Sequence, residues 1–139
     1  MKHNLILRVI AKLLIPIIVL YALYVQFHGD FGPGGGFQAG VIFSVAFIFY
    51  ALVYGIETAE RVMPESVLRI LASLGVLIYA GTGVATMLLG GNFLDYNVLA
   101  SNPIAGQHIG ILVIELGVGI TVSSVMLLIF FIFAGRARQ

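Results

Sequence analysis

The fold of this chain is decided by the stretch His28-Gly29-Asp30-Phe31-Gly32-Pro33-Gly34-Gly35-Gly36-Phe37-Gln38-Ala39-Gly40, which lies between two long apolar runs. Pro33 fixes its own φ angle and lacks a backbone donor, and the three glycines after it can adopt conformations closed to other residues. The flanking runs are long enough to span a bilayer, so the sequence predicts a turn at a membrane surface. A tight hairpin loop explains the proline and two glycines, but not the histidine, aspartate and glutamine gathered around them.

Composition places the whole chain in the membrane. Of 139 residues, 60% are hydrophobic and 9% are charged, whereas a soluble domain carries about 25% charged residues. We therefore expect a single transmembrane domain over 1–139, with room for four helices of about 20 residues. The net charge of +1 and the lack of a basic stripe argue against a nucleic-acid partner. Cysteine is absent, which excludes disulfides, iron–sulfur clusters and thiolate zinc sites.

The beginning of the chain resembles a signal peptide, because basic residues precede an apolar run. That run ends in Gln26-Phe27-His28-Gly29-Asp30, without a small-x-small cleavage site. An uncleaved transmembrane helix is therefore the favoured interpretation.

The predicted fold class is all-α, an integral membrane bundle with helices at about 5–27, 37–56, 67–89 and 103–134. Asn102-Pro103 reads as an N-cap followed by proline at the first position of the last helix. In the charged connector 57–69, Glu57 is expected at the end of the second helix, where a negative charge opposes the helix dipole. Small residues that permit close helix packing recur on one face of the second helix: Gly36, Gly40, Ser44, Ala51 and Gly55.

The basic residues predict the orientation. All seven fall before or near the start of the first helix, in the middle connector or at the end of the chain: Lys2, Arg8, Lys12, Arg61, Arg69, Arg136 and Arg138. By the positive-inside rule, both termini are expected in the cytoplasm, and the glycine-rich turn and the loop 90–103 on the outer side of the cell membrane.

Glu115 is the sharpest functional signal, because it lies well inside the last predicted helix. Ionisable residues at membrane depth are energetically unfavourable and usually face a bundle interior or a water-filled path. Glu115 follows Pro103 by about 18 Å of helix, in the outer half of the hydrocarbon core. Two interpretations remain open: a group that binds and releases a proton or cation, or a protonated side chain hydrogen-bonded to a neighbouring helix.

Other polar residues could line an outer vestibule. His108 precedes Glu115 by two helical turns, on the same face, and its side chain titrates near physiological pH. His28, Asp30 and Gln38 surround the turn. For all of them a solvated or purely structural role is the alternative.

Enzymatic sites are not indicated. Gly34-x-Gly36-x-x-Ala39 shares letters with a dinucleotide fingerprint, but that motif needs a preceding strand, and a phosphate loop needs a following lysine and hydroxyl residue. No nucleophile with a matching base appears, and metal-ligand spacing is missing. We expect neither an enzyme nor a bound cofactor or metal.

Two segments resemble a known family. His28…Pro33-Gly34-Gly35-Gly36-Phe37-Gln38-Ala39-Gly40 is similar to the signature of the MnhB/MrpB family, one of the membrane components of the Mrp (Mnh, Sha) multi-subunit cation/proton antiporters. The segment Gly106-Gln107-His108-Ile109-Gly110-Ile111-Leu112-Val113-Ile114-Glu115-Leu116-Gly117-Val118-Gly119 looks like part of that family's last helix. The resemblance covers nearly the whole chain and includes its four spans.

The resemblance implies a component of a hetero-oligomer that exchanges cytoplasmic Na⁺ for external protons and supports sodium tolerance and pH homeostasis. Its expected partners are the other antiporter subunits, the ions Na⁺ and H⁺, and membrane lipid. On this basis Glu115, His108, His28, Asp30 and Gln38 are expected to line an ion or proton path.

The turn residues Pro33, Gly34, Gly35, Gly36, Phe37 and Gly40 are expected to set the packing of the first two helices. Three alternatives remain: the equivalent subunit of a related hydrogenase or respiratory complex, a purely structural subunit, and a self-sufficient homo-oligomeric transporter.

Overall fold

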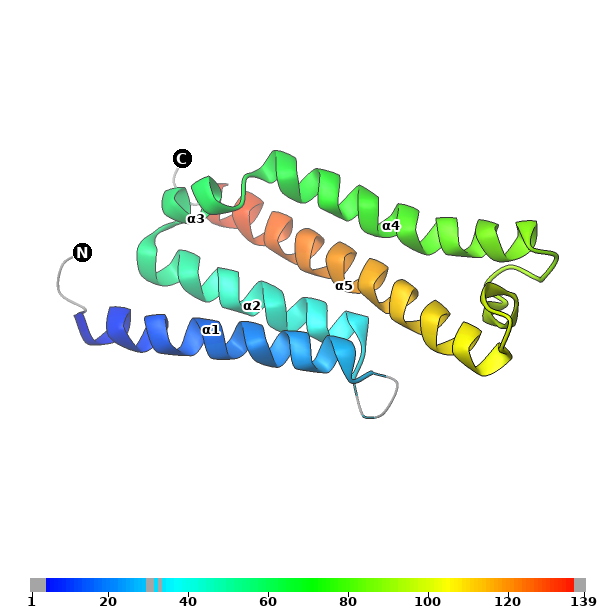
Figure 1. Ribbon diagram of the computed structural model, residues 1–139. Helices are drawn as coiled ribbons and strands as arrows, with labels where there is room; N and C mark the ends of the chain where they lie inside the picture. The colour runs from blue at the N-terminus through cyan, green and yellow to red at the C-terminus, as the bar shows by residue number, and fades with distance from the viewer. Residues whose placement is uncertain (1–4, 30–31, 33, 137–139) are drawn as a thin grey trace.

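The computed structural model describes residues 5–29, 32 and 34–136, with the backbone alone at Arg136. Within these residues the chain is helical, without strands, in the order α1 (Leu5–Phe27), α2 (Gly36–Tyr54), α3 (Ile56–Val62), α4 (Glu65–Leu88), η1 (Tyr96–Leu99) and α5 (Pro103–Arg136). Four of the helices are long and apolar enough to cross a membrane (Figure 1). The prediction of an all-α, four-span membrane protein is confirmed. The predicted residues Lys2, Asp30, Phe31, Pro33 and Arg138 lie outside the described residues.

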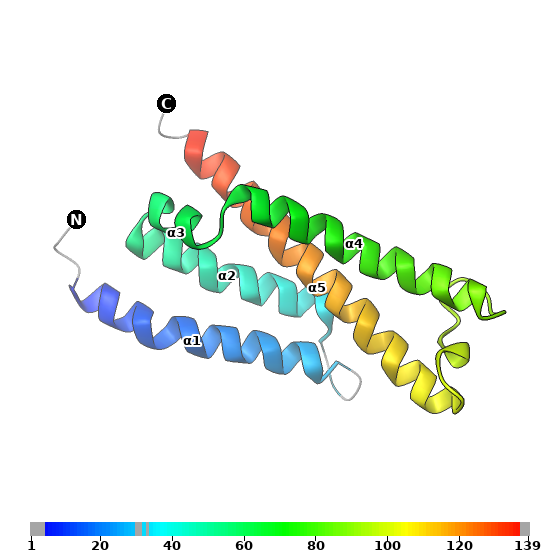
Figure 2. The ribbon, with the colours of Figure 1, turned by 45° about the horizontal axis from the view of Figure 1, so that its top comes forward.

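The long helices form an open bundle with α5 at its centre. Helix α5 packs against α4 on one side and against α2 on the other, and α1 packs mainly on α2 (Figures 1 and 2). Contacts between α1 and α5 are sparse. A pocket there is lined by residues of α1, α2 and α5.

Glycines bring these helices close together. A Cβ at Gly40 would lie 2.7 Å from the backbone oxygen of Gly119, and a Cβ at Gly75 would lie 2.5 Å from that of Gly117. Gly36, Gly40, Ser44 and Ala51 are all buried, as expected for the predicted small-residue face of α2. Close backbone approach through small residues is how helices gain packing contacts in lipid.

The connector after α2 differs from the prediction. Helix α2 ends at Tyr54 because Gly55 takes a φ of 98°, and the short helix α3 then follows. Glu57 consequently lies in the first turn of α3, where a negative charge suits the helix dipole, and not at the end of α2. Ala59 of α3 joins a buried cluster with Leu68 and Phe131.

The loop between α4 and α5 is held by side chains. Thr86 Oγ1 accepts from Leu94 N at 3.0 Å and lies within hydrogen-bond distance of the Asn92 carbonyl at 3.0 Å. The Phe93 ring occupies the space beside Gly83, and the Tyr96 ring covers Gly110. The expected cap is present, because Asn102 Oδ1 accepts from Ile104 N at 3.0 Å.

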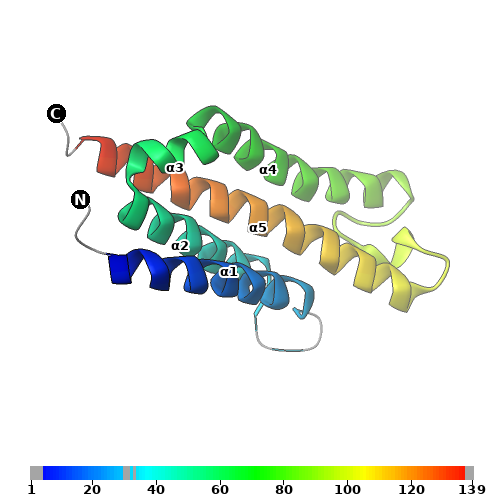
Figure 3. The ribbon, with the colours of Figure 1, turned by 60° about the vertical axis from the view of Figure 1, so that its left-hand side comes forward.

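The ends of the bundle are distinct. The start of α1, helix α3 and the end of α5 lie together at one end, and the α1–α2 and α4–α5 connectors lie toward the other (Figures 1 and 3). Arg8, Arg61 and Arg69 therefore share one end of the bundle. Arg8 there lies over the Tyr54 ring, 5.3 Å from its centre, and Arg69 pairs with Glu65 at 3.1 Å.

Candidate ion-passage site

The glycine turn joins α1 to α2 through closely packed backbone. Gly34 has a φ of 122°, a conformation that favours glycine. Gly35 is the N-cap of α2, and its carbonyl accepts from Ala39 N at 2.9 Å. Gly35 has an extended backbone that any residue could adopt, so its lack of a side chain must have another cause.

That cause is Glu115. A Cβ at Gly35 would lie 2.6 Å from Glu115 Oε1, and a Cβ at Gly29 would lie 2.7 Å from the same oxygen. At Gly36 the space for a Cβ is occupied by the Glu115 backbone carbonyl. The two segments that stand out in the sequence thus meet in space, and the turn accommodates α5 as well as joining α1 to α2.

The start of α2 offers a favourable setting for a carboxylate. The first N–H groups of a helix lack partners within the helix, and its dipole favours negative charge at this end. No side chain caps α2 at Gly35. The half-buried Glu115 carboxylate, which lies beside this N-cap, can supply the negative charge.

Of the other predicted residues, Gln38 and His28 adjoin the glycines that lie against this carboxylate. A Cβ added at Gly35 would lie 4.0 Å from Gln38 Oε1 and 2.6 Å from Glu115 Oε1. His28 is exposed, stacks on Tyr24 with ring centres 5.0 Å apart, and directly precedes Gly29. Both adjoin the glycine turn.

His108 is not brought to the carboxylate. It is exposed on α5, two turns nearer the start of the helix, or about 10 Å along the helix axis. Asp30 cannot be placed, because it lies outside the described residues. The described part of the chain contains no group of three or more His, Asp or Glu side chains that could hold a metal ion.

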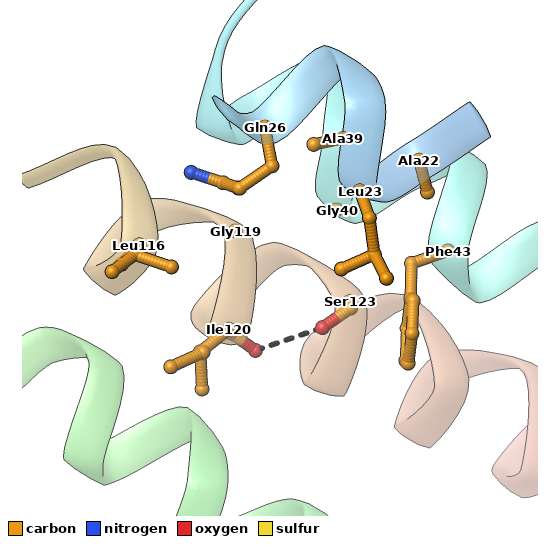
Figure 4. Close-up of a pocket in the computed structure, with 10 residues that line it drawn as sticks. All are labelled: Ala22, Leu23, Gln26, Ala39, Gly40, Phe43, Leu116, Gly119, Ile120 and Ser123. Atoms are coloured by element: carbon orange, nitrogen blue, oxygen red, sulfur yellow. Dashed lines mark hydrogen bonds between the residues drawn. The ribbon is translucent and has the colours of Figure 1, made fainter. Parts of the chain in front are cut away.

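Gln26 was missed by the sequence reasoning. It is 6% exposed, near the end of α1, and its Oε1 lies 2.5 Å from the Cβ position of Gly119, one turn from Glu115 on α5. Figure 4 shows its side chain reaching from α1 toward α5 at the edge of a pocket. An amide within an apolar run was the available signal, but its burial depends on a contact with α5.

Comparisons with known proteins cover both segments. A family described as a domain related to the MnhB subunit of Na⁺/H⁺ antiporters matches residues 6–128. Relatives named "Putative antiporter subunit mnhB2" from Staphylococcus aureus strains Newman, JH1 and USA300 are each 36% identical over 139 residues. Each alignment covers 97% of this chain and 98% of the relative. The matched region contains the glycine turn and Glu115.

Proposed function

Because this chain belongs to the MnhB family of Na⁺/H⁺ antiporter subunits, we propose that Glu115 and the glycine turn form part of the ion passage of its complex. The chain is a multi-pass membrane subunit of an Mnh/Mrp Na⁺/H⁺ antiporter complex, in which other Mnh subunits are its partners. Membership of this family points to a transporter subunit and not to an enzyme.

One observation carries the proposal: a carboxylate in the middle of an apolar span lies against the backbone of a glycine turn. Such a group is unfavourable in lipid and is usually retained for an ion or proton path. Here glycines at positions 29, 35 and 36 leave room for it. Glu115 would bind a proton or Na⁺, both of which a carboxylate oxygen can accept.

Residues on the outer side of Glu115 would form the mouth of the passage. His28 and Gln38 flank the turn, and His108 lies further out on α5. In this proposal the positive-inside rule sets the orientation, with both termini in the cytoplasm and the turn facing outward. Protons would therefore reach Glu115 past His28 and Gln38.

A purely structural role is the alternative, and the packing of Gly36 against the Glu115 carbonyl favours it. The two roles differ in which atoms of Glu115 matter. An ion passage needs the ionisable carboxyl, whereas a structural role needs the space that the glycines provide.

The test is Glu115→Gln in the complete antiporter complex, because glutamine keeps the shape and removes the titratable group. We expect the complex to assemble while antiport, measured as ΔpH dissipation in everted vesicles, is lost or changes its pH profile. Glu65→Gln is the matched control, since Glu65 forms only a surface pair with Arg69. Unchanged antiport in Glu115→Gln, together with failed assembly in Gly35→Leu, would assign the site to structure alone.

A further inference from the structure

Gln26 carries a polar group that the fold buries without satisfying it. Among the described residues its Nε2 is the buried side-chain nitrogen or oxygen atom without a hydrogen-bond partner. An unpaired buried donor is costly, and native proteins rarely keep one without a reason. Neither lipid chains nor the apolar side chains Leu23 and Leu116 around it can accept its hydrogen bond.

Gln26 lies one turn inward of the Glu115 site on both helices that form it. On α1 it precedes Gly29, which contacts the Glu115 carboxylate, by three residues. On α5 its amide lies against Gly119, which follows Glu115 by four residues. One helical turn is about 5.4 Å, a separation that a side-chain rotation or one bridging water molecule can close.

We propose that Gln26 is a positioning residue for Glu115. The Gln26 side-chain amide turns and donates an N–H hydrogen bond, directly or through one water molecule, to the ionised Glu115 carboxylate. The inference rests on the proposed role of Glu115 as the group that binds the ion. It assigns to Gln26 the inner side of the site, opposite His28 and Gln38 on the outer side.

The structure provides room for this movement. A pocket of about 150 Å³ lies beside Gln26 and is lined by residues of α1, α2 and α5 (Figure 4). Small residues, Ala22, Ala39 and Gly40, form part of its wall. A close-packed interior would hold the Gln26 amide in one rotamer, whereas these small residues leave space beside the amide in which it can turn.

Few other charged groups face Glu115 from the elements packed against it. The turn carries His28, and Asp30 of the turn lies outside the described residues. Helix α5 carries His108, about 10 Å further along its axis, and α2 carries the uncharged Gln38. Along α1, the charged residue nearest to the turn is Lys12. The histidines lie on the outer side, so a change at Gln26 isolates the inner neighbour of the carboxylate.

The experiment replaces Gln26 with methionine in the complete complex, since methionine has a similar length and no donor. Without the donor the ionised carboxylate loses a stabilising partner, so the antiport pH profile should move by about one unit toward higher pH. The carboxylate stretching band of Glu115 in pH-induced infrared difference spectra, identified by its loss in Glu115→Gln, should also shift. Ser123→Ala is the matched control, because the Ser123 hydroxyl donates to Ile120 O of its own helix.

Each result decides the inference. A shifted profile and band in Gln26→Met, with neither change in Ser123→Ala, support it. An unmoved profile and band in the assembled complex overturn it. If Gln26→Met reduces assembly, the infrared spectra are recorded for Gln26→Leu and scaled to the amount of intact complex. A shifted Glu115 band there supports the inference, and an unmoved band overturns it.

Failure of this inference is distinguishable from failure of the proposed function. If Glu115→Gln keeps full antiport, the proposed function fails, and the infrared band still reports whether Gln26 touches the carboxylate. If Glu115→Gln abolishes antiport while Gln26→Met moves neither signal, the role of Gln26 alone is refuted.

Discussion

The loop between α4 and α5 satisfies its polar groups with its own side chains and that of Thr86 in the adjoining helix α4, whereas the turn between α1 and α2 receives a side chain from a distant helix. In the loop, Thr86 holds two backbone groups and Asp95 accepts from Asn97 N at 3.3 Å. In the turn, Gly29 and Gly35 leave space that the Glu115 carboxylate fills.

The two connectors also differ in the groups that pack between them and the neighbouring helices. Burial, and to a lesser degree the neighbouring Tyr79, raise the pKa of Tyr96 above its ordinary value of 10.0. Its ring packs over Gly110, so the loop between α4 and α5 serves as a cap on the start of α5. The turn instead packs against the Glu115 carboxylate. On the role proposed for Glu115, we expect substitutions in the loop to affect stability and substitutions in the turn to affect transport as well.

The largest effect is expected at Gly36. An added methyl group in Gly36→Ala would meet the backbone carbonyl of Glu115, which cannot rotate away, so α2 and α5 must separate. We expect a destabilisation of about 3 kcal/mol and little assembled complex on native gels.

Gly81→Ala is the control for this prediction, because nothing lies within 4 Å of the Cβ position of Gly81 in α4. Alanine there should raise helix stability slightly. A Gly36→Ala complex that assembles as well as the Gly81→Ala complex would show that the contact between α2 and α5 is not as close as described.

An intermediate effect is expected at Thr86. Thr86→Val keeps the side-chain shape but leaves Leu94 N without its acceptor, while Asn92 O still accepts from Asp95 N at 3.0 Å. The expected cost is about 2 kcal/mol, which makes amide hydrogen exchange in residues 90–102 roughly 30-fold faster.

The antiport pH profile should not move in Thr86→Val, and this separates the two connectors. Thr82→Val is the control, because the Thr82 hydroxyl donates to Ile78 O within α4, 2.8 Å away. A changed pH profile in Thr86→Val would contradict the assignment of the loop as a structural cap.

Local patterns predicted most of the fold. Apolar runs predicted the four spans, and Asn102-Pro103 marked the start of α5, because caps depend on neighbours in sequence. Helix α3 was missed because seven residues with several charges resemble a loop, and its start depends on the backbone of Gly55.

The candidate site could be predicted only in part. Glu115 and the turn each stood out, but their contact depends on where α5 crosses the start of α2, which no local pattern records. Gln26 gave still less signal, since its burial comes from the backbone of Gly119 on another helix.

The smallest effect is expected at Asn102, and it sharpens the comparison between the two helix starts. Asn102→Ala removes the side-chain cap of α5, whose Oδ1 accepts from Ile104 N at 3.0 Å. The expected loss is about 1 kcal/mol, seen as roughly fivefold faster exchange of the Ile104 amide with unchanged antiport.

Helix α2 has no such cap of its own and lies beside Glu115. If the carboxylate takes the place of that cap, Glu115→Gln should quicken exchange in the first turn of α2 while leaving the first turn of α5 unaffected. If the first turn of α2 exchanges at the same rate in Glu115→Gln as in the unaltered complex, the start of α2 does not depend on the charge of Glu115.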